Sequence, residues 1–264
     1  MADYFKDVTL LITHYNRSIS LGRLLCAFEN MNCQFAEIIV SDDGSESKHI
    51  ALLHQLKGKY KFKLLTTPKN KGLGNNINKG QEAVRTPFTL YIQEDFIPKE
   101  SFACHFKEAL CIMMEDASVD MITLYAYSLY PYLKPYKGRF LEKVFHWEPW
   151  YSDNLKFYLY GDHPHLRKSS FLEDFGRYSE NLNSDNTEFQ MSLSFINKGG
   201  KCLIYEDHYG LLTQDNPQEE PSTAKFRRPN TVGNSFLYKC ARWVYGKIKF
   251  VRLNYKLWTA RRTL

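Results

Sequence analysis

Two hydrophobic patterns alternate regularly over residues 1–116, and this alternation sets narrow limits on the fold. Short apolar or β-branched runs bounded by polar turn residues occupy residues 8–13, 36–41, 61–67 and 87–92. Such runs are typical of strands buried on both faces. Between them, apolar residues repeat at helical spacing, as in Leu21, Leu24, Leu25 and Phe28. The β-α-β-α order predicts an α/β fold with a mostly parallel central sheet flanked by helices.

Polar clusters follow three of these strands. Ligands of parallel sheets bind beyond the carboxyl ends of the strands, so the clusters are expected to meet at one edge. Acidic side chains gathered there need a counter-charge, and a hard divalent cation with diphosphate oxygens supplies one. Alternatively, each acidic residue is a helix cap or a solvated turn residue. The clusters are Thr13-His14-Tyr15-Asn16, Asp42-Asp43-Gly44-Ser45 and Glu94-Asp95.

Composition places the chain among globular proteins, because 44% of its residues are hydrophobic and 24% are charged. Its six cysteines include no C-x-x-C pair, which favours a reducing, cytoplasmic location. A secretory signal is not evident, and no run of 18 apolar residues occurs. We therefore expect neither secretion nor a transmembrane helix.

Positive charge is concentrated in residues 221–264. This segment holds 11 Lys and Arg and no acidic residue, which leaves residues 1–220 with a net charge of −5 within a total of +6. From Phe236 onward, apolar residues recur at helical spacing with basic residues largely elsewhere around the helix. This pattern predicts a basic amphipathic helix that either lies on an anionic membrane surface or packs on the domain. Nucleic-acid binding is not expected, because no known nucleic-acid-binding fold or base-stacking platform is evident.

Periodicity is weak after residue 129, where Tyr, Trp and Pro are frequent and long loops over the sheet are expected. It returns in "DNTEFQMSLSFINKGGK", which predicts a helix that stops at Gly199-Gly200.

Four segments carry a resemblance to a known family. "VTLLITHYNR", "EIIVSDDGS", "NKGLGNNINKG" and "FTLYIQED" follow, in order and at suitable spacing, the strand ends of the GT-A fold in family 2 of the inverting glycosyltransferases. The match is close over about residues 7–96 and looser to about 205. It implies a Rossmann-like GT-A domain over residues 1–220, with a nucleotide-binding half (1–116) and an acceptor half (117–220). A helical extension follows at 221–264.

The resemblance also implies an activity. The family members move a sugar from a nucleotide-diphosphate sugar to an acceptor with the help of a divalent metal. For this chain we expect a UDP-sugar donor and a glycan or lipid-linked acceptor, in bacterial surface polysaccharide or lipopolysaccharide synthesis. The enzyme would be cytoplasmic, with its tail peripheral on the inner face of the cytoplasmic membrane. A sugar nucleotidyltransferase and a non-catalytic, membrane-docked scaffold are the alternatives.

The family's motifs imply roles for individual residues. Thr13, Tyr15 and Asp43, with Asn16 and Asp42 beside them, would hold the nucleobase and ribose, and Asn70, Gly72 and Asn78 would contact the donor. The family's D-x-D element falls on Gln93-Glu94-Asp95, so Asp95 would bind Mg²⁺ or Mn²⁺ with Gln93 and Glu94 next to the nucleotide. His208 matches a position where some relatives place a metal-binding histidine. Ile77 stands where the family usually has Arg.

The general base is a carboxylate that removes the proton from the attacking acceptor hydroxyl. Two alignments to the family's acidic pair give two candidates, Asp185 and Glu188, and the position of Asp185 at the helix start favours it slightly. Either residue is alternatively a first-turn helix acid. Asp162-His163-Pro164-His165 suggests a zinc site less strongly, because no fourth ligand follows at regular spacing.

Overall fold

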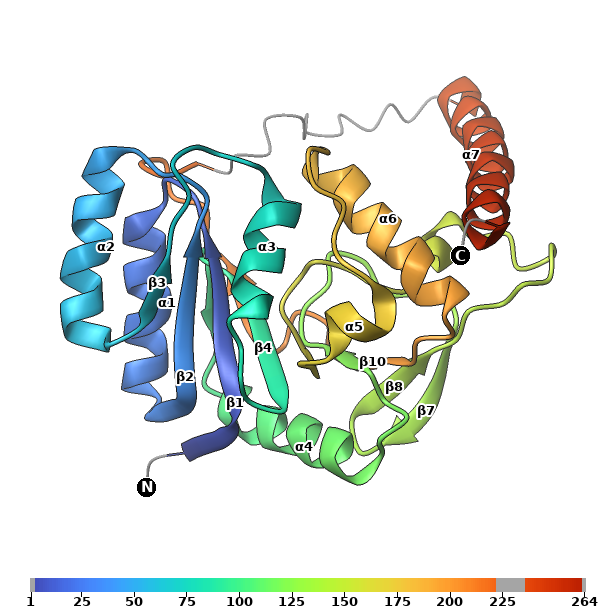
Figure 1. The fold of residues 1–264 in the computed structure, drawn as a ribbon. Coiled ribbons are helices and arrows are strands. Elements are labelled where there is room, and N and C mark those ends of the chain that lie inside the picture. The colour runs from blue at the N-terminus through green and yellow to red at the C-terminus, as the bar shows by residue number, and fades with distance from the viewer. Residues whose placement is uncertain (1–2, 222–235, 263–264) are drawn as a thin grey trace.

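The structure is a computed structural model that describes residues 3–221 and 236–262. A nine-stranded sheet forms the centre of the molecule, in the order β3-β2-β1-β4-β9-β6-β10-β8-β7 (Figure 1). The four predicted strands form its first half: β1 (Asp3–His14), β2 (Cys33–Asp42), β3 (Lys63–Leu65) and β4 (Phe88–Gln93). All four run parallel. Their carboxyl ends therefore meet at one edge, as expected.

The second half of the sheet mixes strand directions. β9 (His165–Lys168) lies antiparallel between β4 and β6 (Met121–Thr123), and β10 (Cys202–Tyr205) runs parallel to β6. A hairpin of β7 (Leu133–Lys137) and β8 (Phe140–Lys143) closes the far edge. The expectation of long loops after residue 129 is wrong for these segments. Their strands have four or five residues, too few to show a period in the sequence.

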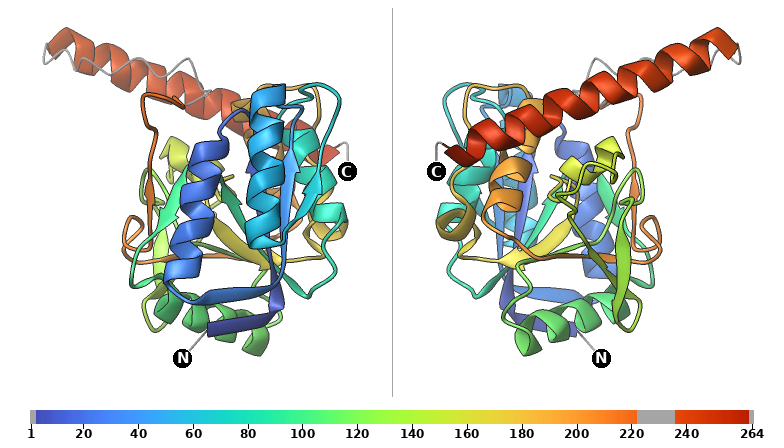
Figure 2. Two further views of the ribbon diagram at one scale, coloured as in Figure 1. Left: turned by 90° about the vertical axis from the view of Figure 1, so that its left-hand side faces the viewer. Right: turned by 90° about the vertical axis from the view of Figure 1, so that its right-hand side faces the viewer.

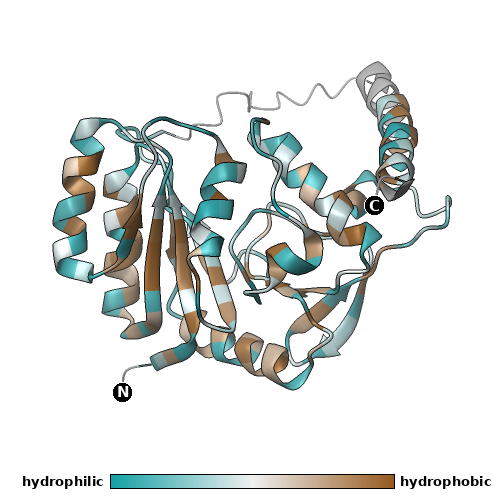
Figure 3. Ribbon diagram, viewed as in Figure 1, coloured by the Kyte–Doolittle hydropathy of each residue, from teal (hydrophilic) through white to brown (hydrophobic). Residues whose placement is uncertain are grey.

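Helices cover both faces of the sheet. Because side chains alternate along a strand, Leu10 and Ile12 of β1 face one layer and Leu11 faces the other. The first layer contains α1 (Ser18–Asn30), α2 (Ser47–Tyr60) and α4 (Phe102–Glu115). The second contains α3 (Leu73–Glu82), α5 (Phe171–Phe175), α6 (Ser184–Asn197) and the short helix η1 (Asn154–Phe157). The central strands accordingly carry the most continuous hydrophobic colour in Figure 3.

A small second sheet lies beside α1. β5 (Phe96–Pro98) directly follows Asp95 and pairs antiparallel with β11 (Leu212–Gln214). We call residues 212–220 the strap, because they run past the start of α1 after β10. Glu220, the last acidic residue of the chain, ends the strap and accepts hydrogen bonds from the backbone N–H groups of Ile19 and Ser20. The last acidic residue before the basic segment 221–264 is thus the one whose side chain caps the start of α1.

The predicted tail helix is α7 (Phe236–Arg262). Two of its leucines, Leu253 and Leu257, are buried in the same hydrophobic cluster as Phe157 of η1 and Phe189 of α6. Figures 1 and 2 show α7 at the end of the molecule where β1 and β2 finish. None of the described helices is long and apolar enough to cross a membrane.

Candidate active site

A cleft of about 820 Å³ opens at the carboxyl ends of β1, β2 and β4. The amino ends of α3 and α6 form its opposite wall, and Gln214 of the strap also lines it. Most of the site residues predicted from the sequence meet here, although they come from five separate segments of the chain. The cleft is lined by Thr13, Tyr15, Asp43, Asn70, Gly72, Gln93, Glu94, Asp95, Asp185 and Glu188 among others.

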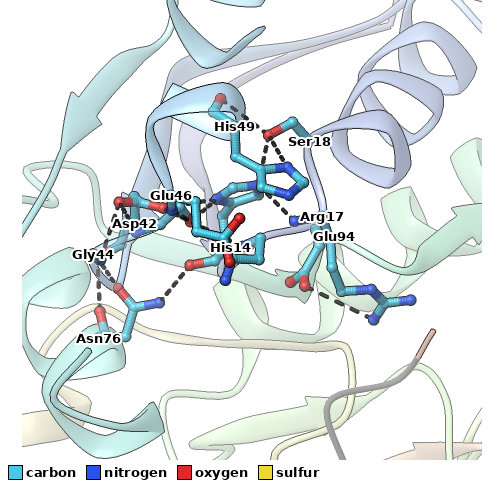
Figure 4. Close-up of polar contacts among 12 residues, drawn as sticks. His14, Arg17, Ser18, Asp42, Gly44, Glu46, His49, Asn76 and Glu94 are labelled. Atoms are coloured by element: carbon cyan, nitrogen blue, oxygen red, sulfur yellow. Dashed lines mark hydrogen bonds and ion pairs between the residues drawn. The ribbon is translucent and has the colours of Figure 1, made fainter. Parts of the chain in front are cut away.

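Asp42 lies behind the cleft and holds the ends of β1 and β2 together. Its carboxylate accepts hydrogen bonds from the His14 ring (2.9 Å) and the Ser45 hydroxyl (2.5 Å). The Ser18 hydroxyl bridges the His14 and His49 rings at 3.2 Å each (Figure 4). Burial opposes ionisation of Asp42, but the bonds from His14 and Ser45 outweigh it, so the pKa of Asp42 is lowered. This geometry gives Asp42 a positioning role instead of a direct place in the cleft.

Asp43 faces the cleft and fixes the loop before α3. Its two carboxylate oxygens accept the backbone N–H groups of Lys71 (2.9 Å) and Gly72 (2.8 Å). Burial nevertheless raises the pKa of Asp43 above its ordinary value. Gly44 makes the contact between the two loops feasible, because a Cβ at its positive φ of 71° would lie 2.4 Å from the Lys69 carbonyl carbon.

Three other nominated residues lie outside the cleft lining. Asn78 is fully buried in α3, where its side chain bonds both the backbone N–H and the carbonyl of Tyr178, at 2.9 Å each. Asn16 holds the loop after β2, because its side-chain oxygen accepts the Glu46 N–H. His208 packs against the Tyr209 ring at a tilt, and it does not line the cleft. The structure therefore places the predicted nucleotide contacts Asn16 and Asn78, and the predicted metal ligand His208, outside the lining of the cleft.

The carboxylates that follow β4 face an arginine. Arg17, at the start of α1, places its Nη1 3.0 Å from Asp95 Oδ2 and 3.8 Å from Glu94 Oε1. All three side chains are buried. Burial, and then the charge of Asp95, raises the pKa of Glu94, while Arg17 acts in the opposite direction. Sequence reasoning missed this role for Arg17, although the residue ends the quoted segment "VTLLITHYNR".

The strap completes the surroundings of this ion pair. Gln214 donates to Asp95 Oδ2 at 2.8 Å, and Asn216 accepts from Arg17 Nη2 at 2.6 Å. Asp95 Oδ1 is buried and has no hydrogen-bond partner within residues 3–221 and 236–262. A hard divalent cation prefers such a carboxylate oxygen, so Asp95 fits the metal role that the sequence predicts. Gln93 brings no charge to this site.

The far side of the cleft holds a second group of donor atoms. Asp162, His163 and Glu188 each offer one ligand atom, and these atoms lie within 4.8 Å of one another. Glu188 Oε1 accepts the backbone N–H of Asp162 at 3.3 Å. Asp185 stands one turn earlier on α6 and is exposed. Both candidate bases therefore line the cleft, but only Glu188 is half-buried.

His165 does not join this group. Its side chain is fully buried in β9, and its Nδ1 lies 2.6 Å from the carbonyl oxygen of His163. Burial lowers its pKa well below the ordinary value for histidine. The Asp-His-Pro-His segment thus splits between the cleft and the core, and the two histidines do not form one zinc site.

A sequence profile described as glycosyl transferase family 2 matches residues 9–175, which is more than half of the chain. The chain belongs to glycosyl transferase family 2. Family membership and the GT-A-like architecture, both expected from the four segments, are confirmed. None of the curated proteins compared with this family 2 chain matches it significantly.

Solved structures show the same fold. TarS from S. aureus in complex with UDP-GlcNAc superposes with a TM-score of 0.60 at 16% identity, over 80% of this family 2 chain and 59% of that chain. The mannosyltransferase PcManGT from Pyrobaculum calidifontis, in complex with GDP-Man and Mn²⁺, gives 0.53 at 12% identity. That match covers 76% of this chain and 55% of PcManGT. The chain therefore spans less than two thirds of either protein.

Proposed function

We propose that this chain is a metal-dependent inverting glycosyltransferase. It would move a sugar from a nucleotide-diphosphate sugar, UDP-linked by preference, to a glycan or lipid-linked acceptor in bacterial surface polysaccharide synthesis. The observation that carries the proposal is the meeting of Asp43, Asp95 and Glu188 in one cleft of nucleotide-sugar size. That TarS binds UDP-GlcNAc and PcManGT binds GDP-Man with Mn²⁺ supports this donor class.

The nucleoside half of the donor fits beside Asp43 and Thr13. The Asp43 carboxylate has spare acceptor capacity beyond its two backbone bonds, and an imide N–H of uracil is a suitable donor. Thr13 is held by a 3.1 Å hydrogen bond to the Tyr91 hydroxyl, so its position is fixed before the ligand arrives. We assign base and ribose recognition to this wall of the cleft.

The diphosphate half fits beside Asp95. A divalent cation held by Asp95 would offset the charge that develops on the leaving nucleoside diphosphate. Arg17 lines the same part of the cleft, and its guanidinium would be a suitable donor to phosphate oxygens. Together these groups would stabilise the leaving group where charge grows during the reaction.

We assign the general base to Glu188. An effective base is held at a fixed position within reach of the acceptor hydroxyl. The hydrogen bond from the Asp162 N–H fixes the Glu188 carboxylate inside the cleft, whereas Asp185 is exposed at the helix start. In-line attack from this side, opposite the diphosphate, would invert the configuration of the sugar.

Measurement of nucleotide release tests this function. The chain is mixed with UDP-, GDP- and TDP-sugars, Mn²⁺ and a panel of lipid-linked and free glycans. We expect release of one nucleoside diphosphate together with a product that gains one sugar. A parallel mixture contains nucleoside triphosphates and sugar phosphates, and pyrophosphate release there would support the nucleotidyltransferase instead. No turnover in either mixture would support the scaffold.

We also propose that α7 holds the enzyme on an anionic membrane surface. About 100° of turn per residue places five of the six exposed large hydrophobic side chains described in α7 within an arc of about 80°, opposite the buried Leu253 and Leu257. The sixth, Tyr245, lies to one side of this arc. Lys247 and Arg252 flank this stripe, and basic residues with aromatic and aliphatic neighbours are typical of membrane-surface helices. The stripe consists of Val244, Ile248, Val251, Tyr255 and Trp258.

Figure 1 shows α7 at the same end of the molecule as the carboxyl ends of β1, β2 and β4, whose residues line the cleft. Docking through α7 would therefore bring the cleft near a lipid-linked acceptor. Vesicle co-sedimentation tests the surface: we expect binding to vesicles rich in phosphatidylglycerol but not to neutral ones, and loss of binding in Ile248→Glu/Val251→Glu. Met114→Glu/Leu129→Glu, which alters exposed apolar residues elsewhere, is the control. Self-association that the same glutamates abolish, without vesicle binding, would assign the stripe to a second copy.

A further inference from the structure

The Asp95 site already contains a cation that belongs to the chain. The β1–α1 turn delivers Arg17 to the floor of the cleft, where 4% of the residue is exposed. Its backbone N–H donates to His14 Nε2, which ties it to the network behind Asp42. Figure 4 shows the guanidinium beside the Glu94 carboxylate. The position of this positive charge is therefore set by the fold.

The hydrogen bonds of this pair are incomplete on both sides. Arg17 Nη1 and Nη2 have partners, but Arg17 Nε is buried without one among the described residues. Asp95 Oδ2 is shared by Arg17 and Gln214, while Asp95 Oδ1 is unpartnered in the same part of the chain. Buried polar atoms usually have a partner in the protein, in ordered water or in a bound ion, so both atoms are candidate contacts for a ligand of this cleft. One atom suits a metal ion and the other a phosphate oxygen.

A divalent cation on Asp95 Oδ1 would be close to the guanidinium on Oδ2. Two positive groups at that separation repel each other strongly in a buried site. The carboxyl groups of Glu94 and Asp95 carry too little negative charge to compensate the guanidinium and a divalent cation at the same time. A diphosphate brings the additional negative charge, accepts hydrogen bonds from Arg17 and coordinates the metal.

We propose that Arg17 couples cation binding to donor binding. Without donor, Arg17 is the counter-ion of Asp95 and opposes a divalent cation. With a nucleoside diphosphate in the cleft, the guanidinium pairs with the phosphates and the cation binds Asp95 tightly. This inference rests on the proposed donor site, but it concerns the order and coupling of binding and not the transfer reaction.

Mn²⁺ binding measured by electron paramagnetic resonance tests the coupling, in the intact chain and without any turnover. For the unaltered chain we expect weak binding of Mn²⁺ alone and binding about tenfold tighter or more with UDP. Arg17→Met should bind Mn²⁺ alone about tenfold more tightly than the unaltered chain, with a smaller gain from UDP. Arg23→Met is the matched control, because Arg23 also lies on α1 but pairs with Asp215.

Arg17→Met leaves two buried carboxylates without their cation and so risks misfolding. The pair Glu94→Gln and Glu94→Gln/Arg17→Met reduces this difficulty, because Asp95 is then the one acidic side chain left of the pair and the two variants differ only at residue 17. We expect the double variant to bind Mn²⁺ alone more tightly than Glu94→Gln. The coupling would be overturned if removal of Arg17 left the affinity for Mn²⁺ alone unchanged, both in the unaltered chain and in Glu94→Gln. It would also be overturned if UDP tightened Mn²⁺ binding as much in Arg17→Met as in the unaltered chain. Absence of sugar transfer, with the coupling intact, would instead overturn the proposed function.

Discussion

The guanidinium of Arg17 lies 3.0 Å from the carboxylate of Asp95, and both groups are buried. One positive charge of the chain itself therefore already pairs with the acidic residues at the end of β4. A buried ion pair is costly to break from one side, because the remaining charge is left without compensation. A substitution that leaves one buried charge unpaired can therefore unfold the chain as well as lower its activity. Only substitutions that keep the remaining charges paired report on catalysis alone.

Asp95→Asn should abolish most of the activity without unfolding the chain. The amide keeps the size of the side chain but is a poor metal ligand, and Glu94 remains to balance Arg17. We expect turnover of the nucleotide sugar to fall about 10²-fold or more. Turnover is measured by nucleoside diphosphate release, and folding by circular dichroism. Asp215→Asn, at a partly exposed neighbour, is the control, and near-normal turnover by Asp95→Asn would reject the metal assignment.

Glu188→Gln should lower turnover far more than Asp185→Asn. General-base catalysis contributes about 10²- to 10⁴-fold, and Gln cannot accept the acceptor proton. Because both residues lie on the cleft wall, the two conservative changes perturb it similarly. Turnover with saturating acceptor distinguishes them. The opposite order, with Asp185→Asn the more damaged variant, would transfer the base to Asp185 as the sequence slightly favoured.

Glu220→Ala should destabilise the domain at neutral pH. The carboxylate accepts two backbone N–H groups of α1 and the Ser20 hydroxyl, and we expect a loss of about 1–3 kcal/mol in the free energy of unfolding. Burial opposes ionisation of Glu220, but these bonds prevail and lower its pKa. The stabilisation is therefore present above the unfolded value of 4.5 and is lost as the pH falls through the folded pKa.

Urea unfolding at pH 7 and at pH 3 measures this contribution. The difference between the unaltered chain and Glu220→Ala should narrow at the lower pH. The exposed neighbour Glu219 provides the control Glu219→Ala, which should change little at either pH. A Glu220→Ala chain as stable as the unaltered one at pH 7 would show that the strap does not support α1.

His165 should make the domain less stable in mild acid. Burial lowers its pKa, so the folded chain resists the proton that the unfolded chain accepts below about pH 6.5. Stability is then lost at about 1.4 kcal/mol per pH unit below that value. In His165→Gln the slope of unfolding free energy against pH should be shallower by that amount between pH 6 and 5. An unchanged slope in His165→Gln would contradict the assignment of a buried, neutral imidazole to His165.

The nucleotide-binding half, residues 1–116, could be predicted from sequence because its strands and helices are long enough for each to show its own hydrophobic period. β1 and β2 have enough buried residues to reveal strands, and the polar residues directly after them, such as Thr13 and Asp43, necessarily reach the sheet edge. The same reasoning placed Asn78 by motif alone and could not see that Tyr178, a hundred residues later, occupies its side chain.

The remaining features depend on contacts that no local pattern encodes. Arg17 meets Asp95 only because β1 and β4 are adjacent in the sheet, and Gln214 joins them only through the pairing of β11 with β5. Likewise, the hydrophobic residues of α7 gave two readings of the tail. The structure shows that one face of α7 packs on the domain, where Leu257 is buried, while Val251 on the opposite face is 68% exposed. Membrane binding by that exposed face is a proposal.

The most direct test is calorimetric titration of UDP into the chain with and without Mn²⁺, repeated with Asp95→Asn. We expect Mn²⁺ to tighten UDP binding about tenfold or more in the unaltered chain and to have no such effect in Asp95→Asn. UDP binding that ignores Mn²⁺ in both proteins would contradict the account that the cleft at the ends of β1, β2 and β4 is a metal-assisted nucleotide-sugar site.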